Sequence, residues 1–154
     1  MKTGLITFLC LLLCASCQVA EKTQEGEVIV GHKSYPNAFT IVTPLSGIYY
    51  TGDTIQLSLK FPVTIHVDTT IGDPSLTLDF GGTQVWANYV SGEGTEYLNF
   101  EYVVTASDTD LNGIDILSMS MNGAAITYTG GGMVNSCNTT ISISHFSAIT
   151  VNAP

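Results

Sequence analysis

The stretch SDTDLNGI near the middle of the chain has the oxygen spacing with which many calcium-binding loops begin. Such loops place oxygen ligands at positions 1, 3, 5 and 7 and a bidentate glutamate at position 12. Asp108, Asp110 and Asn112 match the first three positions, and the backbone carbonyl of Ile114 matches the fourth. Position 12 is Met119, so other loops would have to supply the strongest ligand. The spacing predicts a weak calcium site. A turn between two strands, held by Asx hydrogen bonds, is the alternative.

Sequence motifs for catalysis are missing from the chain. There is no Gly-x-Ser-x-Gly or His-Glu-x-x-His motif and no glycine-rich phosphate loop before a helix. His32, His66 and His145 lie far apart in the sequence. A catalytic triad that assembles only in space leaves no local signature, but nothing here indicates one, and we expect that the protein is not an enzyme.

Trp86 is the one tryptophan of the chain and a candidate ligand-binding residue. On its expected strand Val85, Ala87 and Tyr89 share the apolar face, which places Trp86 on the outward face. An exposed indole on a sheet can stack on a sugar ring, as in many carbohydrate-binding modules. Tyr97 has the outward position on the next strand and could lie beside Trp86. The alternative is that Trp86 covers a sheet edge or packs under a loop or the N-terminal segment.

The chain is acidic, with thirteen Asp and Glu residues against four lysines and no arginine, and its formal net charge is −9. Proteins bind nucleic acid through clustered Lys and Arg, so we expect no nucleic-acid partner. Neutral glycans, other protein surfaces and cations remain as partners. With 45% hydrophobic and only 11% charged residues, the chain has the composition and length of one folded domain.

The N-terminus resembles a bacterial lipoprotein signal. A positive residue is followed by the apolar run LITFLCLLL, which is too short to span a bilayer, and then by Ala15, Ser16 and Cys17. The resemblance implies that residues 1–16 are removed and that Cys17 carries lipid, so that the membrane is a partner through this anchor. Gln18, where Asp often signals inner-membrane retention, favours the outer membrane, with the protein periplasmic or surface-exposed. A plain secretory peptide is the alternative.

The segment after the anchor is polar and charged, and we expect residues 17–37 to form a flexible tether between the lipid and the domain. Cys137 is then the one cysteine of the domain itself. It has no disulfide partner within the mature chain, and pairing between chains stays open.

From about residue 38 onward, apolar and polar residues alternate in short segments between glycine-bearing turns, and no segment has a helical period. Alternation with a period of two predicts strands with one apolar face. The predicted inward residues are Ile55, Leu57, Leu59, Phe61, Val63, Ile65, Val67, Leu76, Leu78, Phe80, Val85, Ala87, Tyr89, Leu98, Phe100, Tyr102, Val104, Leu117, Met119, Met121, Ile141, Ile143, Ile149 and Val151. We expect residues 38–154 to form an all-β domain, an antiparallel sandwich of about seven to nine strands.

Strand directions then predict which loops meet. We expect a chain reversal at Phe61-Pro62 and an antiparallel course throughout. Under this assignment loop 105–113 shares an end of the domain with Phe61-Pro62 and Gly81-Gly82, and Asp79 is the nearest acid. The acids expected at the opposite end, where they could hold a separate cation, are Asp53, Asp68, Asp73, Glu93 and Glu96.

The segments GIYYTGDTIQLSLKFPVTIHV and PSLTLDFGGTQVWANYVSGEGTEYLNFEYVVTASDTDLNGIDILSMSMNGAAI resemble the bacterial Ig-like repeats that occur in tandem in large surface, adhesin and motility-associated proteins. The most specific parts are residues 50–54, 89–95, 108–113 and 121–123. The resemblance implies an Ig-like sandwich that serves as a spacer or adhesive module and has no catalytic residues. Three functions therefore compete: adhesion or protein–protein interaction at the bacterial surface, carbohydrate binding, and a purely structural role in the cell envelope.

Overall fold

The computed structural model describes residues 39–130 and 144–154, which all belong to one compact unit. The predicted signal peptide (1–16), Cys17 with its tether (17–37), Cys137 and the strand predicted around Ile141 and Ile143 lie outside the described residues. Within the two described ranges, no helix is long and apolar enough to span a membrane.

Eleven strands account for most of the described residues. They are β1 (Thr40–Val42), β2 (Gly47–Tyr49), β3 (Thr54–Asp68), β4 (Ser75–Phe80), β5 (Thr83–Ser91), β6 (Thr95–Val103), β7 (Thr109–Asp110), β8 (Ile114–Ser120), β9 (Ala125–Tyr128), β10 (Ser144–Phe146) and β11 (Ile149–Asn152). The strongest alternation of buried and exposed residues lies in β3, the longest strand.

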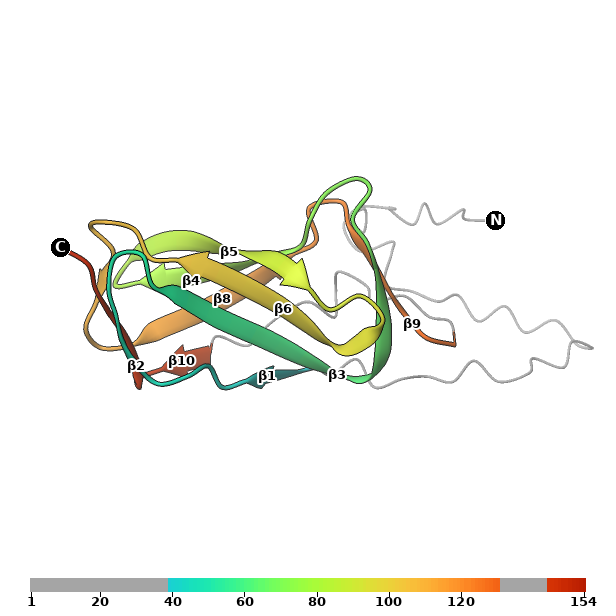
Figure 1. The fold of residues 1–154 in the computed structure, drawn as a ribbon, viewed down its shortest axis with the longest axis horizontal. Helices are drawn as coiled ribbons and strands as arrows, with labels where there is room; N and C mark the ends of the chain where they lie inside the picture. Colours follow the sequence, from blue (N-terminus) through green and yellow to red (C-terminus); the bar gives the residue numbers. More distant parts are fainter. Residues whose placement is uncertain (1–38, 131–143) are drawn as a thin grey trace, which may run out of the picture. The chain divides into compact units, whose positions relative to one another are not determined.

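Eight of these strands form one sheet in the order β1-β3-β6-β5-β4-β8-β10, with β9 beside β3. Neighbouring strands in this sheet run antiparallel. The sheet curls like half of a barrel (Figure 1). A small second sheet has the order β2-β11-β7, in which β11 is parallel to β2 and antiparallel to β7. The predicted all-β class is confirmed. Over the described residues the fold is antiparallel except for the β2–β11 pair, it has eleven strands where about seven to nine were predicted, and the strand order does not clearly show two sheets packed face to face.

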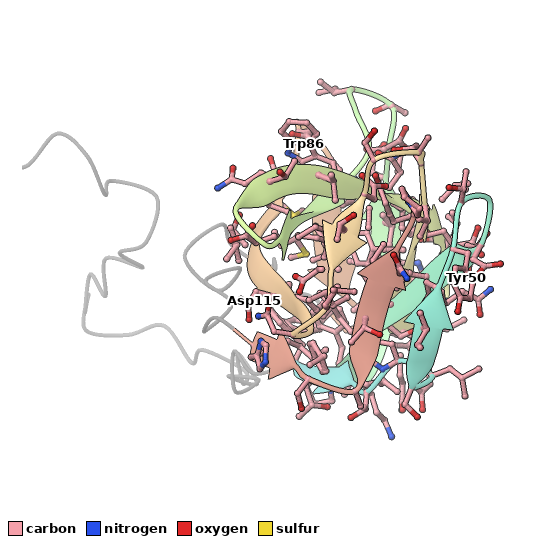
Figure 2. The ribbon with its side chains drawn as sticks, turned by 90° about the vertical axis from the view of Figure 1, so that its left-hand side faces the viewer. Tyr50, Trp86 and Asp115 are labelled. Carbon is pink, nitrogen blue, oxygen red and sulfur yellow. The ribbon has the colours of Figure 1, made fainter. Side chains whose placement is uncertain are left out.

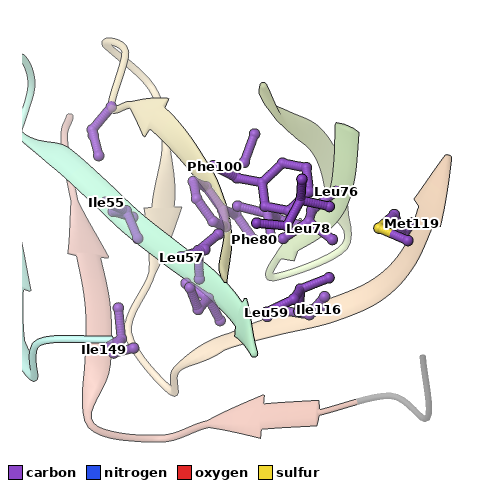
Figure 3. Close-up of a cluster of buried hydrophobic side chains, with 14 of the residues drawn as sticks. Ile55, Leu57, Leu59, Leu76, Leu78, Phe80, Phe100, Ile116, Met119 and Ile149 are labelled. Atoms are coloured by element: carbon purple, nitrogen blue, oxygen red, sulfur yellow. The ribbon is translucent and has the colours of Figure 1, made fainter. Parts of the chain in front are cut away.

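The hydrophobic core fills the inner face of the curled sheet, where the alternation predicted it (Figure 3). Ile55, Leu57 and Leu59 of β3 are at most 1% exposed. Ile149 and Val151 of β11 belong to the same buried cluster, so the small sheet contributes to this core. Each such aliphatic side chain contributes about 1.5–3 kcal/mol when it is fully buried.

The turn predicted at Phe61-Pro62 is wrong, because β3 continues through these residues. The pairing of β3 with β6 is instead irregular between Lys60 and Ile65. Proline lacks the N–H that a regular ladder requires, and a bulge accommodates this lack as well as a turn does.

Without a reversal in β3, the assignment of loops to the two ends of the sheet changes for Asp53. The Val104 N–H donates to the Asp53 carbonyl at 2.9 Å, and the Gly52 N–H donates to the Val104 carbonyl at 2.8 Å. Asp53 therefore lies beside loop 105–113 and not at the opposite end, as was predicted. The prediction that Gly81-Gly82 meets this loop is confirmed, because the Gly81 N–H donates to Asp110 at 2.9 Å.

A second irregularity changes which residues of β8 face the core. The register of β8 against β4 shifts at Leu117, which is an extra residue between two regular stretches. Ile114 and Ile116 are fully buried before the shift, and Met119 is buried after it. The predicted inward position of Met119 is confirmed, whereas Leu117 is only partly buried.

Gly113 approaches the end of β10 too closely to carry a side chain. Its φ is +113°, and a Cβ there would lie 2.5 Å from the Phe146 carbonyl oxygen. At Gly82, φ is +99° but a Cβ would meet nothing within 4 Å.

We predict that Gly113→Ala lowers the free energy of unfolding by about 3–4 kcal/mol and Gly82→Ala by about 1–2 kcal/mol, as measured by urea unfolding. Equal losses would contradict a role for the close approach to Phe146.

Candidate functional site

Asp108 is a buried carboxylate that holds the loop after β6 in place. Only 9% of the residue is exposed. Its Oδ2 atom accepts hydrogen bonds from the Tyr102 hydroxyl at 2.7 Å, the Thr105 N–H at 2.7 Å and the Thr105 hydroxyl at 3.0 Å. Burial raises the pKa of Tyr102, and its hydrogen bond to Asp108 raises the pKa further. The arrangement keeps the Tyr102 hydroxyl protonated and donating to a charged acceptor.

Asp110 is more deeply buried, at 3% exposed, and it joins two turns. Its Oδ1 atom accepts from the backbone N–H groups of Asn112 at 3.2 Å and Gly113 at 3.0 Å, which is an Asx-type turn. Its Oδ2 atom accepts from the Gly81 N–H at 2.9 Å, in the turn between β4 and β5. This one side chain therefore fixes the loop internally and against a neighbouring turn.

The predicted calcium ligands are thus close together in the chain but differ in their surroundings. Asn112 is exposed, whereas Ile114 is fully buried at the start of β8. Asp79, the acid expected nearest, accepts the Gly82 N–H at 2.7 Å. Among residues 39–130 and 144–154, no group of three or more His, Cys, Asp or Glu side chains is placed to hold a metal ion. The Asp108 and Asp110 carboxylates already accept hydrogen bonds from N–H and O–H donors, which a calcium ion would have to replace or share. Calcium at this loop therefore stays a prediction.

Trp86 lies on the outer face of β5, as predicted, and 59% of the residue is exposed. Figure 2 shows its indole ring projecting away from the core. Trp86 is paired with Thr77 of β4 across the sheet, and Thr77 is paired with Ser118 of β8. Its immediate neighbours on this side are therefore short hydroxyl side chains that leave the ring accessible.

Tyr97 is also outward, at 39% exposed, but it is not beside Trp86. Because Asn88 of β5 pairs with Glu101 of β6, continuation of this register places Trp86 opposite Val103. Tyr97 is six residues from Val103, which is about 20 Å along an extended strand. The Lys60 ammonium instead lies 5.6 Å from the centre of the Tyr97 ring, at a cation–π distance. The two aromatic residues do not form one site.

A shallow hollow of about 560 Å³ lies next to Trp86 on the outer face of the sheet. Its polar wall is a connected group: the Ser120 hydroxyl donates to Asn122 Oδ1 at 2.6 Å, and Asn122 Nδ2 donates to the Ser75 hydroxyl at 3.0 Å. The residues that line the hollow are Ser75, Val85, Trp86, Asn88, Tyr102, Ser120 and Asn122.

Most of these lining residues were not identified from the sequence. Ser75 starts β4, Ser120 ends β8 and Asn122 follows it, so they meet only through the pairing of β4 with β8. Outward alternation on β5 also places Asn88 on the face of Trp86, and this was the one local signal available.

Glu93 joins the β5–β6 turn to the second half of β3. Its Oε1 atom lies 3.0 Å from His66 Nδ1, and its Oε2 atom accepts the Val67 N–H. Two hydrogen bonds hold the pKa of Glu93 below its usual value: the one with His66 has the larger effect, and the one from the Val67 N–H has the smaller effect. Both side chains of the His66–Glu93 pair are more than half exposed, so solvent screens their attraction.

A second acid–histidine pair lies on β8 and β10, at the edge of the sheet away from β3. Asp115 of β8 has Asp79 of β4 opposite it on one side and His145 of β10 on the other. His145 Nδ1 is 2.9 Å from Asp115 Oδ1 (Figure 2 labels Asp115). Carboxylates directly opposite on paired strands repel, and the imidazole beside Asp115 reduces this repulsion when it is protonated.

Comparison with known proteins finds no family model, no curated protein and no solved structure that matches the chain.

Asp110 should stabilise loop 105–113 through the hydrogen bonds that it accepts. We expect Asp110→Asn to lower the free energy of unfolding by about 1–3 kcal/mol, because an amide would turn a donor toward the Gly81 N–H and leave a buried group unsatisfied. If the loop is only an Asx turn, urea unfolding should show the same loss in EDTA and in millimolar Ca²⁺; the predicted calcium site requires a larger loss in Ca²⁺. Asp73→Asn, at an exposed acid, is the matched control for the change in charge. A loss that arises only with Ca²⁺ would show that the loop acts as a calcium site.

The hydrogen bonds of Glu93 should make the stability of the domain depend on pH. Because the pKa of Glu93 is lowered in the folded state, its contribution to stability is fully present above its unfolded pKa and is lost as the pH falls through the folded pKa. We expect the melting temperature of the wild type to exceed that of Glu93→Gln near pH 7 and the difference to shrink in acid. Circular dichroism melts from pH 7 to pH 3 test this, with Glu96→Gln, an exposed acid of the same hairpin, as the control. A difference that stays constant with pH would refute the assignment.

Proposed function

We propose that the chain is a non-enzymatic cell-envelope lipoprotein whose single β domain mediates adhesion or protein–protein interaction at the bacterial surface. Residues 1–16 are its signal peptide, Cys17 carries the lipid, and residues 17–37 are the tether. The anchor lies in the outer membrane, with the domain in the periplasm or at the cell surface. This part of the proposal is supported by the order of charged, apolar and small residues before Cys17.

The observation that carries the binding role is the outer face of β5 and β6. One face of the curled sheet packs on the core, while the other presents apolar side chains to solvent. Trp86 is 59%, Val103 55% and Val90 47% exposed, and all three lie on these two neighbouring strands. Exposed apolar side chains that gather on one face commonly mark a binding site.

The proposed domain type is a bacterial Ig-like repeat with a sandwich architecture. Each stretch that carries the resemblance contains a turn: residues 51–52, 92–94, 111–113 and 122–123 separate strands. The small β2-β11-β7 sheet contributes buried residues to the core and would form part of the second layer. In such a domain the strands support the loops and faces that meet partners, and no residue performs chemistry.

Two other functions are alternatives: carbohydrate binding and a purely structural role in the envelope. Carbohydrate binding is favoured by a specific observation, the polar hollow beside Trp86. A purely structural role in the envelope would require no binding face at all.

The proposal predicts that attachment depends on both the anchor and the exposed face. In a deletion strain complemented with variants, Cys17→Ser should move the protein out of the membrane fraction, and Val103→Asp should reduce attachment by about tenfold by placing a charge on the binding face. Leu45→Asp, which adds the same charge at a residue 82% exposed outside β5 and β6, is the control. If the deletion strain attaches as well as the wild type, and no envelope protein co-purifies with the wild-type lipoprotein, the structural role is favoured.

A further inference from the structure

We propose that the hollow beside Trp86 binds a neutral carbohydrate, with a sugar ring stacked on the indole. This inference rests on the proposed function, because it names the ligand class of the same outer face. The hollow of about 560 Å³ is within the range of about 300–1,000 Å³ that small-molecule sites occupy. It is open to solvent on one side, so it fits part of a longer oligosaccharide.

The aromatic part of the site is a flat ring that is held on a rigid support. Trp86 lies in the middle of β5, which pairs with β4 on one side and with β6 on the other. Its ring is exposed and its outward direction is set by the sheet (Figure 2). A fixed indole offers apolar area to the C–H face of a sugar at little cost in side-chain entropy.

The polar part of the site is a row of side chains at corresponding positions on five neighbouring strands. This row passes through Ser120 of β8, Ser75 of β4, Asn88 of β5, Glu101 of β6 and Gln56 of β3. It contains hydroxyl, amide and carboxylate groups, which can both donate to and accept from sugar hydroxyls. Of this row, Ser120, Ser75 and Asn88 line the hollow, two residues along β5 from Trp86, so they are the polar groups nearest to a ring stacked on the indole.

Asn88 is the side chain of this row that is best placed to bind a ligand. Gln56 Nε2 donates to Glu101 Oε1 at 3.1 Å, and Ser75 accepts from Asn122. Within the part of the chain that the structure describes, the Asn88 amide is exposed and has no hydrogen-bond partner. Its two donors and one acceptor oxygen are thus available to hydroxyl groups at the edge of the hollow.

Charge decides which carbohydrates the site accepts. Glu101 is next to Asn88, the whole chain has a net charge of −9, and neither Lys nor Arg lines the hollow. A uronic acid, a sialic acid or a phosphorylated glycan would be repelled here. Inside the hollow the exposed apolar surface is one indole among serines and amides, so a protein partner would have to contact the exposed valines outside it. Neutral hexose and N-acetylhexosamine units fit the chemistry.

The test uses the full mature lipoprotein in detergent micelles on an array of neutral and acidic oligosaccharides, followed by calorimetric titration of the best neutral binder. We expect Trp86→Ala to weaken binding at least about tenfold and Asn88→Ala several-fold. Trp86→Phe keeps a smaller ring and should give an intermediate affinity. Tyr97→Ala removes an exposed aromatic residue about 20 Å away and should leave the affinity within about twofold of the wild type.

Each outcome separates this inference from the proposed function. Binding of a neutral sugar that is lost in Trp86→Ala but kept in Tyr97→Ala supports the inference. No neutral sugar bound, equal binding by Trp86→Ala, or a preference for acidic glycans overturns it. If no sugar binds while Val103→Asp still reduces cell attachment, the partner is a protein and only the carbohydrate inference fails. If sugars bind through Trp86 while deletion leaves attachment unchanged, the adhesion role fails and the carbohydrate inference stands.

Discussion

Strand β3 pairs with β6 on one side along most of its length, while on the other side its partner changes from β1 to β9. The change spans the irregularity between Lys60 and Ile65, where Pro62 cannot donate to a ladder. On both sides of it the strand keeps apolar residues on the inner face, so one continuous core persists through the bend. The curl of the sheet, the meeting of loops at each end and the exposure of the outer face all depend on this continuous strand.

Alternation along the sequence predicts which face each residue occupies, because side-chain direction in a strand has a period of two. It placed Ile55, Leu57 and Leu59 inward and Trp86 outward, and all four positions are confirmed. The same pattern contains no information on whether Pro62 marks a turn or a bulge, because both conformations tolerate a missing N–H. The wrong choice moved Asp53 to the wrong end of the domain and added a reversal that the chain does not make.

The two candidate sites differ in whether their residues are neighbours in the sequence or are brought together only by the fold. The acids of loop 105–113 were recognised by spacing, but spacing cannot tell whether a carboxylate meets a cation or the N–H groups of its own loop, as Asp108 and Asp110 do. The hollow beside Trp86 depends on the pairing of β4 with β8 and β5, which brings Ser75, Asn88 and Asn122 together. Such pairings follow from the whole fold, so the local sequence indicated only the tryptophan.

The parallel pairing of β2 with β11 has a mechanical consequence. A force that enters the domain from its N-terminal side meets β1 first, and β1 is held by pairing at only three positions, with Ser58, Leu59 and Lys60. The force then reaches β2. β2 and β11 are parallel. When the N-terminal end of one strand and the C-terminal end of the other are pulled apart, the pair is loaded in shear, and all of its hydrogen bonds resist together. An antiparallel pair pulled at adjacent ends would open one bond at a time. Tension from the N-terminal side is therefore resisted first by the pairing of β1 and the packing of Phe39 on Phe61, and then by the parallel β2–β11 pair as a whole.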